Sequence, residues 1–195
     1  WLPFGPMGTS PWERTHARRA ACAINLFDAQ GFENTTVAQI ADAAGVSEMT
    51  FFRHFATKEH AILADPYDPA IASAIEAQPP GPALIRAARG VRSALAQVPT
   101  EEIENVRRRL RIISRSPHLR AKSVGTSGVS EAAISAQLAA DGAAPIVARA
   151  AAAAVIASLS TALIEWAESE REPLTSMLDL ALLVLEAREG ASGDD

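Results

Sequence analysis

The four-residue junction Ala44-Gly45-Val46-Ser47 constrains the fold of this 195-residue chain more than any other feature. Glycine tolerates the positive φ of a tight turn between helices, valine fills the angle of the turn, and serine caps a new helix at once. The apolar spacing on either side predicts two short helices, one beginning near Thr36 and one after Ser47. Two helices joined in this way form a helix-turn-helix.

A longer helix precedes this pair. Pro11 is a typical first helical residue, and apolar side chains then recur at the spacing of one buried helix face until Gly31. The pattern therefore predicts a small N-terminal domain of three helices over residues 11–62. Residues 1–10 show no periodicity, and we assign them to a disordered arm or a tag.

The remainder of the chain, residues 63–195, is also predicted to be helical. A fourth helix should begin near residue 57 and continue, with a Pro-rich interruption, through residue 75. Further helical patterns occupy residues 83–97, 101–114, 117–140, 145–170 and 173–188. The composition agrees, because 48% hydrophobic but only 5% aromatic residues suit closely packed helices. We expect an all-α fold of about nine helices, with a larger C-terminal domain.

The last two helices carry apolar residues over wide arcs, which predicts packing against both their own core and a partner subunit. The most apolar run, residues 150–164, is shorter than the roughly 20 residues that span a bilayer, so we expect a buried helix and no membrane partner. The first residues show no signal-peptide pattern, which predicts a cytoplasmic protein.

The N-terminal domain also carries a series of motifs in a defined order. The series is Gly31-Phe32, Thr35-Thr36-Val37, Ile40-Ala41, Ala44-Gly45-Val46-Ser47, Thr50-Phe51-Phe52-Arg53-His54-Phe55 and Lys58-Glu59. In order and spacing it resembles the DNA-binding signature of the TetR family of transcriptional regulators. The resemblance implies a DNA-binding domain over residues 11–62 and a ligand-binding and dimerisation domain over residues 63–195. Residues 107–121 are similar to the sixth and seventh helices of regulators with a C-terminal domain of the mycofactocin-regulator type.

The third helix would then be the recognition helix, whose first side chains meet base edges in the major groove. These candidates are Ser47, Glu48, Met49 and Thr50. A glutamate accepts hydrogen bonds from cytosine, and a methionine can contact a thymine methyl group. The alternative for Glu48 is an ordinary first-turn position that favours the positive end of the helix.

Contacts to the DNA backbone are expected from Thr36, Arg53, His54 and Lys58. For His54 and Lys58 the alternative is an exposed polar residue at a helix end. Phe52 occupies a position where many relatives have tyrosine, so a hydroxyl contact to DNA is missing there. Residues 11–62 hold five basic and six acidic side chains, so DNA affinity should depend on placed contacts and its salt dependence should be modest.

Basic residues are instead concentrated in residues 86–122, which hold ten of them against three acidic ones. One interpretation is an anionic effector, such as an acyl thioester of coenzyme A, held by arginine side chains in a cleft between helices. The alternative is a set of solvated helix faces, with core or interface packing for the tryptophan. The candidate ligand contacts are Arg86, Arg89, Arg108, Arg111, Arg115 and Trp166.

No catalytic residue, metal site or cofactor is predicted. The acidic turn at residues 101–104 fits helix capping, and the four histidines show no metal-ligand spacing. We therefore expect a homodimeric repressor that binds a palindromic operator and is released by a small effector. Two alternatives remain: a small helical enzyme acting on a phosphorylated or CoA-bearing substrate, and an adaptor that has lost DNA binding.

Overall fold

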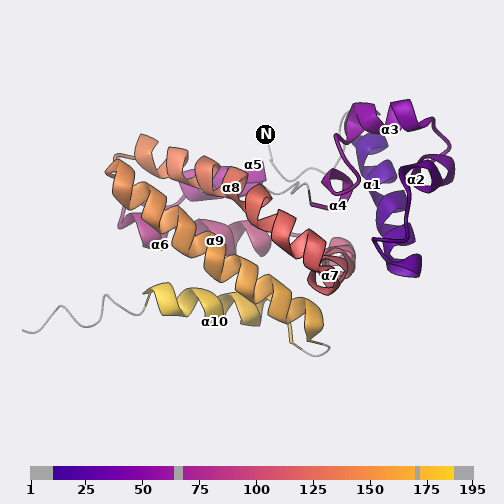
Figure 1. Cartoon of the computed structure of the whole chain (residues 1–195). Helices are drawn as coiled ribbons and strands as arrows, with labels where there is room; N and C mark the ends of the chain where they lie inside the picture. The colour runs from indigo at the N-terminus through magenta and orange to yellow at the C-terminus, as the bar shows by residue number, and fades with distance from the viewer. Residues whose placement is uncertain (1–10, 64–67, 170–171, 187–195) are drawn as a thin grey trace, which may run out of the picture. The chain divides into compact units, whose positions relative to one another are not determined.

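The structure is a computed structural model that describes residues 11–63, 68–169 and 172–186. Those residues form ten α-helices and no strand (Figure 1), so the all-α fold is confirmed. The count exceeds the expected nine because the helix predicted from residue 57 through 75 is present as two, on either side of residues 64–67. The helices are α1 (Pro11–Gln30), α2 (Val37–Ala43), α3 (Glu48–His54), α4 (His60–Leu63), α5 (Asp68–Glu76), α6 (Ala83–Leu95), α7 (Thr100–Arg115), α8 (Pro117–Ala140), α9 (Pro145–Glu168) and α10 (Leu174–Glu186).

The chain divides into two compact units, each made of two separate segments of the sequence. Among the described residues, the first unit comprises residues 11–63 together with Arg108–Thr126, and the second comprises the others. The end of α7 and the beginning of α8 therefore belong with the N-terminal helices. The sequence pattern gave no sign of this, and the predicted arm at residues 1–10 lies outside the described residues.

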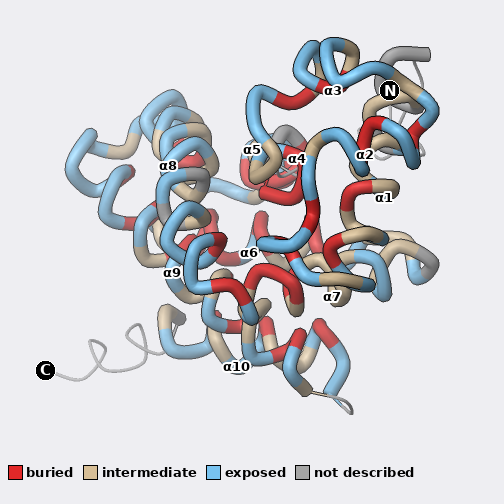
Figure 2. Tube along the Cα trace, turned by 45° about the vertical axis from the view of Figure 1, so that its right-hand side comes forward, coloured by how far each residue is buried: buried red, intermediate tan, exposed pale blue. Residues whose placement is uncertain are grey.

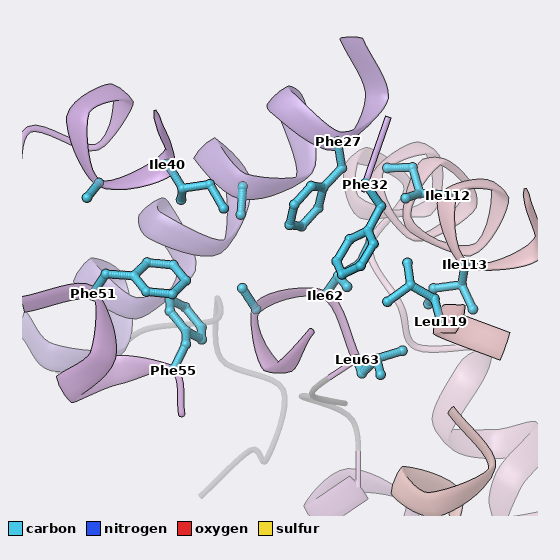
Figure 3. Close-up of a cluster of buried hydrophobic side chains, with 13 residues drawn as sticks. Phe27, Phe32, Ile40, Phe51, Phe55, Ile62, Leu63, Ile112, Ile113 and Leu119 are labelled. Atoms are coloured by element: carbon cyan, nitrogen blue, oxygen red, sulfur yellow. The ribbon is translucent and has the colours of Figure 1, made fainter. Parts of the chain in front are cut away.

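The first unit is held together by an aromatic core. Phe27, Phe51 and Phe55 are at most 2% exposed, and the ring centroids of Phe51 and Phe55 lie 5.2 Å apart. Figure 3 shows these rings with Phe32 beside Phe27, and with aliphatic side chains from α4, α7 and α8 completing the cluster. The aliphatic members that Figure 3 labels are Ile40, Ile62, Leu63, Ile112, Ile113 and Leu119.

The second unit is built around α6 and α9. Helix α9 packs against α6 and α10, and α6 also packs against α5 and α10. Helix α6 has buried residues in succession, as expected for a helix covered by α5, α9 and α10, whereas buried positions recur at intervals along α9 and α10 (Figure 2).

Helix α9 has 24 residues and, by length and composition alone, is long and apolar enough to cross a membrane. The sequence predicted no membrane span because residues 150–164 are too few to cross a bilayer. The whole helix is longer than that run, so this reason does not apply to it. Part of this apolar surface is buried inside the protein, where Val155, Leu159 and Trp166 lie in the core.

Helices α5 and α6 approach each other closely at Gly90. A Cβ atom placed on Gly90 would lie 2.4 Å from Ile75 Cγ1 and 2.7 Å from Ile75 Cα. Only glycine allows this approach, so the position limits how α5 can lie on α6.

Candidate DNA-binding site

The turn between α2 and α3 has the geometry that the junction predicts. Gly45 has a φ of +67°, and its N–H donates to Asp42 O at 2.9 Å. The N–H of Val46 donates to Ala41 O at 2.9 Å, which satisfies a carbonyl at the end of α2. The chain thus reverses within the few residues before α3 begins at Glu48.

Thr36 forms a complete capping box at the start of α2. Its hydroxyl accepts a hydrogen bond from Gln39 N at 3.2 Å, and its own N–H donates to Gln39 Oε1 at 2.9 Å. Gln30 Nε2 donates to the same Gln39 oxygen at 3.0 Å, so the cap is tied to the end of α1. The start of α2 is therefore ordered before any contact with DNA is made.

Ser47 caps α3 in a similar way. Its Oγ accepts from Thr50 N at 3.2 Å and donates to Thr50 Oγ1 at 3.0 Å. The two hydroxyl groups predicted to meet base edges are thus also engaged with each other in the free protein.

The outward side of α3 is an arc of four residues: Glu48, Met49, Phe52 and Arg53 are all exposed. We call these four residues the reading face. The side chain positions of Phe51 and Phe55, in contrast, are fully buried in the aromatic core. Residues on opposite sides of a short helix are thereby divided between core and solvent, so the core sets the rotation of α3 about its own axis.

Lys58 has an internal role that the sequence did not predict. Its Nζ donates to Phe32 O at 2.8 Å and to Thr35 O at 2.9 Å, and it lies 4.0 Å from the centroid of the Phe32 ring. An ammonium group has three donors, and the two carbonyls engage two of them. Lys58 joins the turn before α4 to the loop between α1 and α2.

Histidine side chains of α1 and α3 meet near the end of α3. The ring centroid of His16 lies 4.4 Å from that of Phe55 and 5.9 Å from that of His54. Burial lowers the pKa of His54, and the charges of Arg19 and Arg53 lower it further. His54 is therefore held toward its neutral form, in which it donates a hydrogen bond without carrying charge.

Polar groups around the start of α8 contact residues in the connections between the N-terminal helices. His118 Nε2 lies 2.8 Å from Glu59 Oε1, and Ser116 Oγ donates to Glu33 Oε1 at 3.3 Å. Lys122 Nζ lies 3.5 Å from the same Glu59 oxygen. Sequence reasoning missed this cluster, because its paired residues are 59 and 83 positions apart in the chain and helical periodicity does not relate them.

The pKa of Glu59 reflects these contacts. Burial of the carboxyl would raise the pKa, but hydrogen bonds from His118, from the backbone and from Thr57, with the charge of Lys122, lower it to about 2. Glu59 is therefore a carboxylate at any physiological pH. It is a fixed negative group to which α8 is attached.

The candidate ligand residues are divided between the two units. Arg108, Arg111 and Arg115 fall in the first unit, and the other three fall in the second. Arg86 is internal: its Nη1 lies 2.8 Å from Asp141 Oδ2, and its Nη2 donates to Ile75 O at 3.2 Å. Beside this ion pair lies a pocket of about 230 Å³ in the second unit. Its lining residues are Gly81, Ala83, Arg86, Leu138, Asp141, Gly142, Ala143 and Val147.

Trp166 is fully buried within the second unit. The guanidinium of Arg107 lies 4.4 Å from its ring centroid, and Arg107 Nη1 donates to Ser169 O, at the end of α9, at 2.7 Å. Trp166 thus packs within one chain, which is the alternative to a ligand contact that the sequence left open.

Arg89, by contrast, is exposed on α6. Within the described ranges, no group of three or more His, Cys, Asp and Glu side chains is placed to hold a metal ion.

Capped helices on either side of a tight turn, with an exposed face on the second helix, define a helix-turn-helix protein with a helical C-terminal domain. Residues 21–64 match the bacterial regulatory proteins of the tetR family, and residues 81–190 match the MftR C-terminal domain. The chain belongs to the TetR family and is a transcriptional regulator. Both resemblances drawn from the sequence are confirmed.

A named relative supports this assignment. The chain is 39% identical over 129 residues to the HTH-type transcriptional regulator TcmR of Streptomyces glaucescens. The matched stretch covers 62% of this chain and 57% of TcmR, so the chain spans less than two thirds of that relative. The family and this relative are regulators of transcription and not enzymes, which sets the enzyme alternative aside.

Solved structures share the fold. The fatty acid degradation regulator FadR of Bacillus halodurans aligns with a TM-score of 0.60 at 16% identity, over 93% of this chain and 98% of FadR. FadR of Bacillus subtilis, solved in complex with stearoyl-CoA, aligns with a TM-score of 0.56 at 17% identity, over 92% of this chain and all of that one.

Proposed function

We propose that this regulator is a cytoplasmic homodimeric repressor that binds a palindromic operator and is released from it by a small hydrophobic or acyl-CoA-like effector. The observation that carries the DNA-binding part is the reading face of α3, which is exposed and held in orientation by the buried rings of Phe51 and Phe55. In a dimer, two such helices about 34–36 Å apart would meet successive major grooves of one DNA duplex.

The proposed contacts divide into two groups. Glu48 and Met49, with the hydroxyls of Ser47 and Thr50, meet base edges. Thr36, Arg53 and His54 contact phosphates. Lys58 contacts a phosphate through its third N–H donor, since the other two are engaged by backbone carbonyls. The DNA-binding segment carries no excess positive charge, so we expect a shallow dependence of affinity on salt.

The proposed dimer interface lies on the last two helices. Leu180, Leu183 and Val184 of α10 are 65%, 57% and 74% exposed, and their spacing places them on one stripe of the helix. An apolar stripe exposed on one subunit is the surface expected to be covered by a second copy in a symmetric dimer. Trp166 is not part of this surface because it is already buried within one chain.

The proposed effector is an anionic molecule with an apolar chain, for which Arg89, Arg108, Arg111 and Arg115 remain candidates. The support is the excess of basic residues in residues 86–122 and the stearoyl-CoA bound to the structurally similar FadR of Bacillus subtilis. Such an effector lowers operator affinity only if it binds the DNA-incompetent conformer more tightly than the competent one.

The primary test is selection of a binding site from a random DNA pool, followed by fluorescence anisotropy over a salt series with and without stearoyl-CoA. We expect a palindromic site, and weaker binding in the presence of the ligand. Binding that the ligand leaves unchanged contradicts the effector assignment alone. The absence of any selected sequence contradicts DNA binding and favours the adaptor alternative.

A second test addresses the dimer. Leu183→Glu places a charge on the exposed stripe of α10 and is expected to give a monomer by light scattering, with loss of operator binding. Val129→Glu is the matched control, because Val129 is 65% exposed but lies on α8. A Leu183→Glu variant that remains dimeric would place the interface elsewhere.

A further inference from the structure

The reading face of α3 has an unusual chemistry for a surface that meets DNA. Met49 is 83% exposed and Phe52 is 49% exposed, and the two lie three residues apart on one side of the helix. Glu48 and Arg53 flank them and are exposed as well. The middle of the reading face is therefore apolar, and its charged groups lie at the edges.

The core prevents these two apolar side chains from turning inward. Phe51 is fully buried, and Phe52 meets it edge to face with ring centroids 5.7 Å apart. Because α3 is anchored through Phe51 and Phe55, burying Met49 or Phe52 would require rotating both rings out of the aromatic core. The apolar pair therefore stays exposed until another molecule covers it.

The major groove offers one apolar feature, the C5-methyl group of thymine. We propose that Met49 and Phe52 together read thymine methyl groups at the centre of each operator half-site. This inference rests on the proposed DNA binding and specifies the base chemistry read by the same helix. Phe52 is then a specificity-determining residue, and its missing hydroxyl makes the apolar contact surface larger.

The low charge of the DNA-binding segment agrees with this assignment. Five basic and six acidic side chains in residues 11–62 provide no general attraction to phosphates. Apolar contacts with base methyl groups do not depend on charge, so they can supply sequence preference where electrostatic attraction is weak.

The experiment replaces thymine by uracil, which removes only the methyl group, at each thymine of the operator selected by the full-length protein. At one or more positions per half-site we expect affinity to fall about fourfold, the effect of one buried methyl group. If Met49 covers that methyl group, the same uracil substitution should leave the affinity of the Met49→Ala variant unchanged. If Phe52 covers it, the affinity of the Phe52→Ala variant should be unchanged instead. Val129→Ala, which shortens an exposed apolar side chain on α8, should behave like the wild type.

Changing the sensitive thymine to cytosine also removes the methyl group and should weaken binding. 5-Methylcytosine at that position returns the methyl group and should restore part of the affinity. If no thymine-to-uracil change weakens binding to a selected operator, the inference is overturned while DNA binding stands. Equal weakening of all sequences by Met49→Ala and Phe52→Ala also overturns it. If no operator can be selected, the proposed function fails and the inference fails with it.

Discussion

Glu59 Oε1 lies 2.8 Å from Nε2 of His118, and this pair attaches the first turn of α8 to the helix-turn-helix unit. The carboxylate belongs to the segment that begins α4, and the imidazole follows Pro117 at the start of α8. Phe32 lies beside the same imidazole, with ring centroids 5.9 Å apart. Helix α8 begins in the first unit at this contact, and its residues from Ser127 onward belong to the second unit.

Replacing Glu59 by Gln should destabilise the first unit by roughly 1 kcal/mol at neutral pH, the upper end for partly exposed ion pairs. The pKa of Glu59 is lowered to about 2, so its contribution is complete above its ordinary value of 4.5 and is lost as pH falls toward 2. Chemical denaturation of both proteins at pH 7 and pH 3 measures this. The difference between them should shrink at pH 3, and an equal difference at both pH values would contradict the assignment.

The capping box at Thr36 predicts a local stability effect. Thr36→Ala removes the hydroxyl that accepts from Gln39 N and should lower the free energy of unfolding by about 1 kcal/mol. Thr36→Ser keeps the acceptor and serves as the control, with a loss of a few tenths of a kcal/mol at most. Urea denaturation followed by circular dichroism distinguishes the two. Equal losses would show that the methyl group, and not the cap, is responsible.

Gly90 and Gly128 provide a pair of opposite predictions. Gly90→Ala would bring a Cβ atom within 2.8 Å of Ile75 backbone atoms, and it should cost at least about 2 kcal/mol because α5 and α6 must separate. Gly128 lies within α8 with no atom within 4 Å of a Cβ, so Gly128→Ala should stabilise that helix by up to about 1 kcal/mol. Thermal unfolding of both variants tests this, and a neutral Gly90→Ala would mean that α5 moves freely on α6.

The helix pattern was predictable because local rules decide it. Gly45 supplies the positive φ that the turn requires, and Thr36 and Ser47 supply the capping hydroxyls. The assignment of residues 108–126 to the first unit was not predictable. It depends on contacts such as that between Leu119 and the aromatic core, which join residues far apart in the chain, and helical periodicity carries no information about them.

The site could be predicted by residue type but not by partner. A run of arginines indicates positive charge, yet it does not reveal that Arg86 is paired with Asp141 or that Arg107 lies over Trp166. Lys58 shows the same limit. Its position at a helix start suggested a phosphate contact, while two carbonyl oxygens already engage its ammonium group.

His16 predicts how stability depends on pH. Burial lowers its pKa below 6.5, and the charges of His54, His60 and Arg19 lower it further. As pH falls, His16 therefore becomes protonated near pH 6.5 in the unfolded chain but only at a lower pH in the folded protein. The free energy of unfolding should decrease as pH falls below 6.5. His16→Gln removes this contribution, so its unfolding free energy should vary less between pH 7.5 and pH 5.5, and an unchanged slope would contradict the role of His16.

His54 extends the same reasoning to DNA affinity. Its pKa is lowered in the free protein, first by burial and then by Arg19 and Arg53. A phosphate beside the imidazole would favour the protonated form, so DNA binding takes up a proton in the window between the two pKa values. Operator affinity should therefore increase as pH falls from 7.5 to 6.0, by at most about tenfold per pH unit.

Anisotropy titrations with the selected operator at these two pH values measure the effect. His54→Gln should bind more weakly at pH 6.0 and lose most of the pH dependence, because glutamine cannot take up the proton. His118→Gln is the control, since His118 pairs with Glu59 and should leave the pH dependence of operator affinity intact. If His54→Gln keeps the full pH dependence, His54 does not contact a phosphate, and it is then a partly buried polar residue at the end of α3.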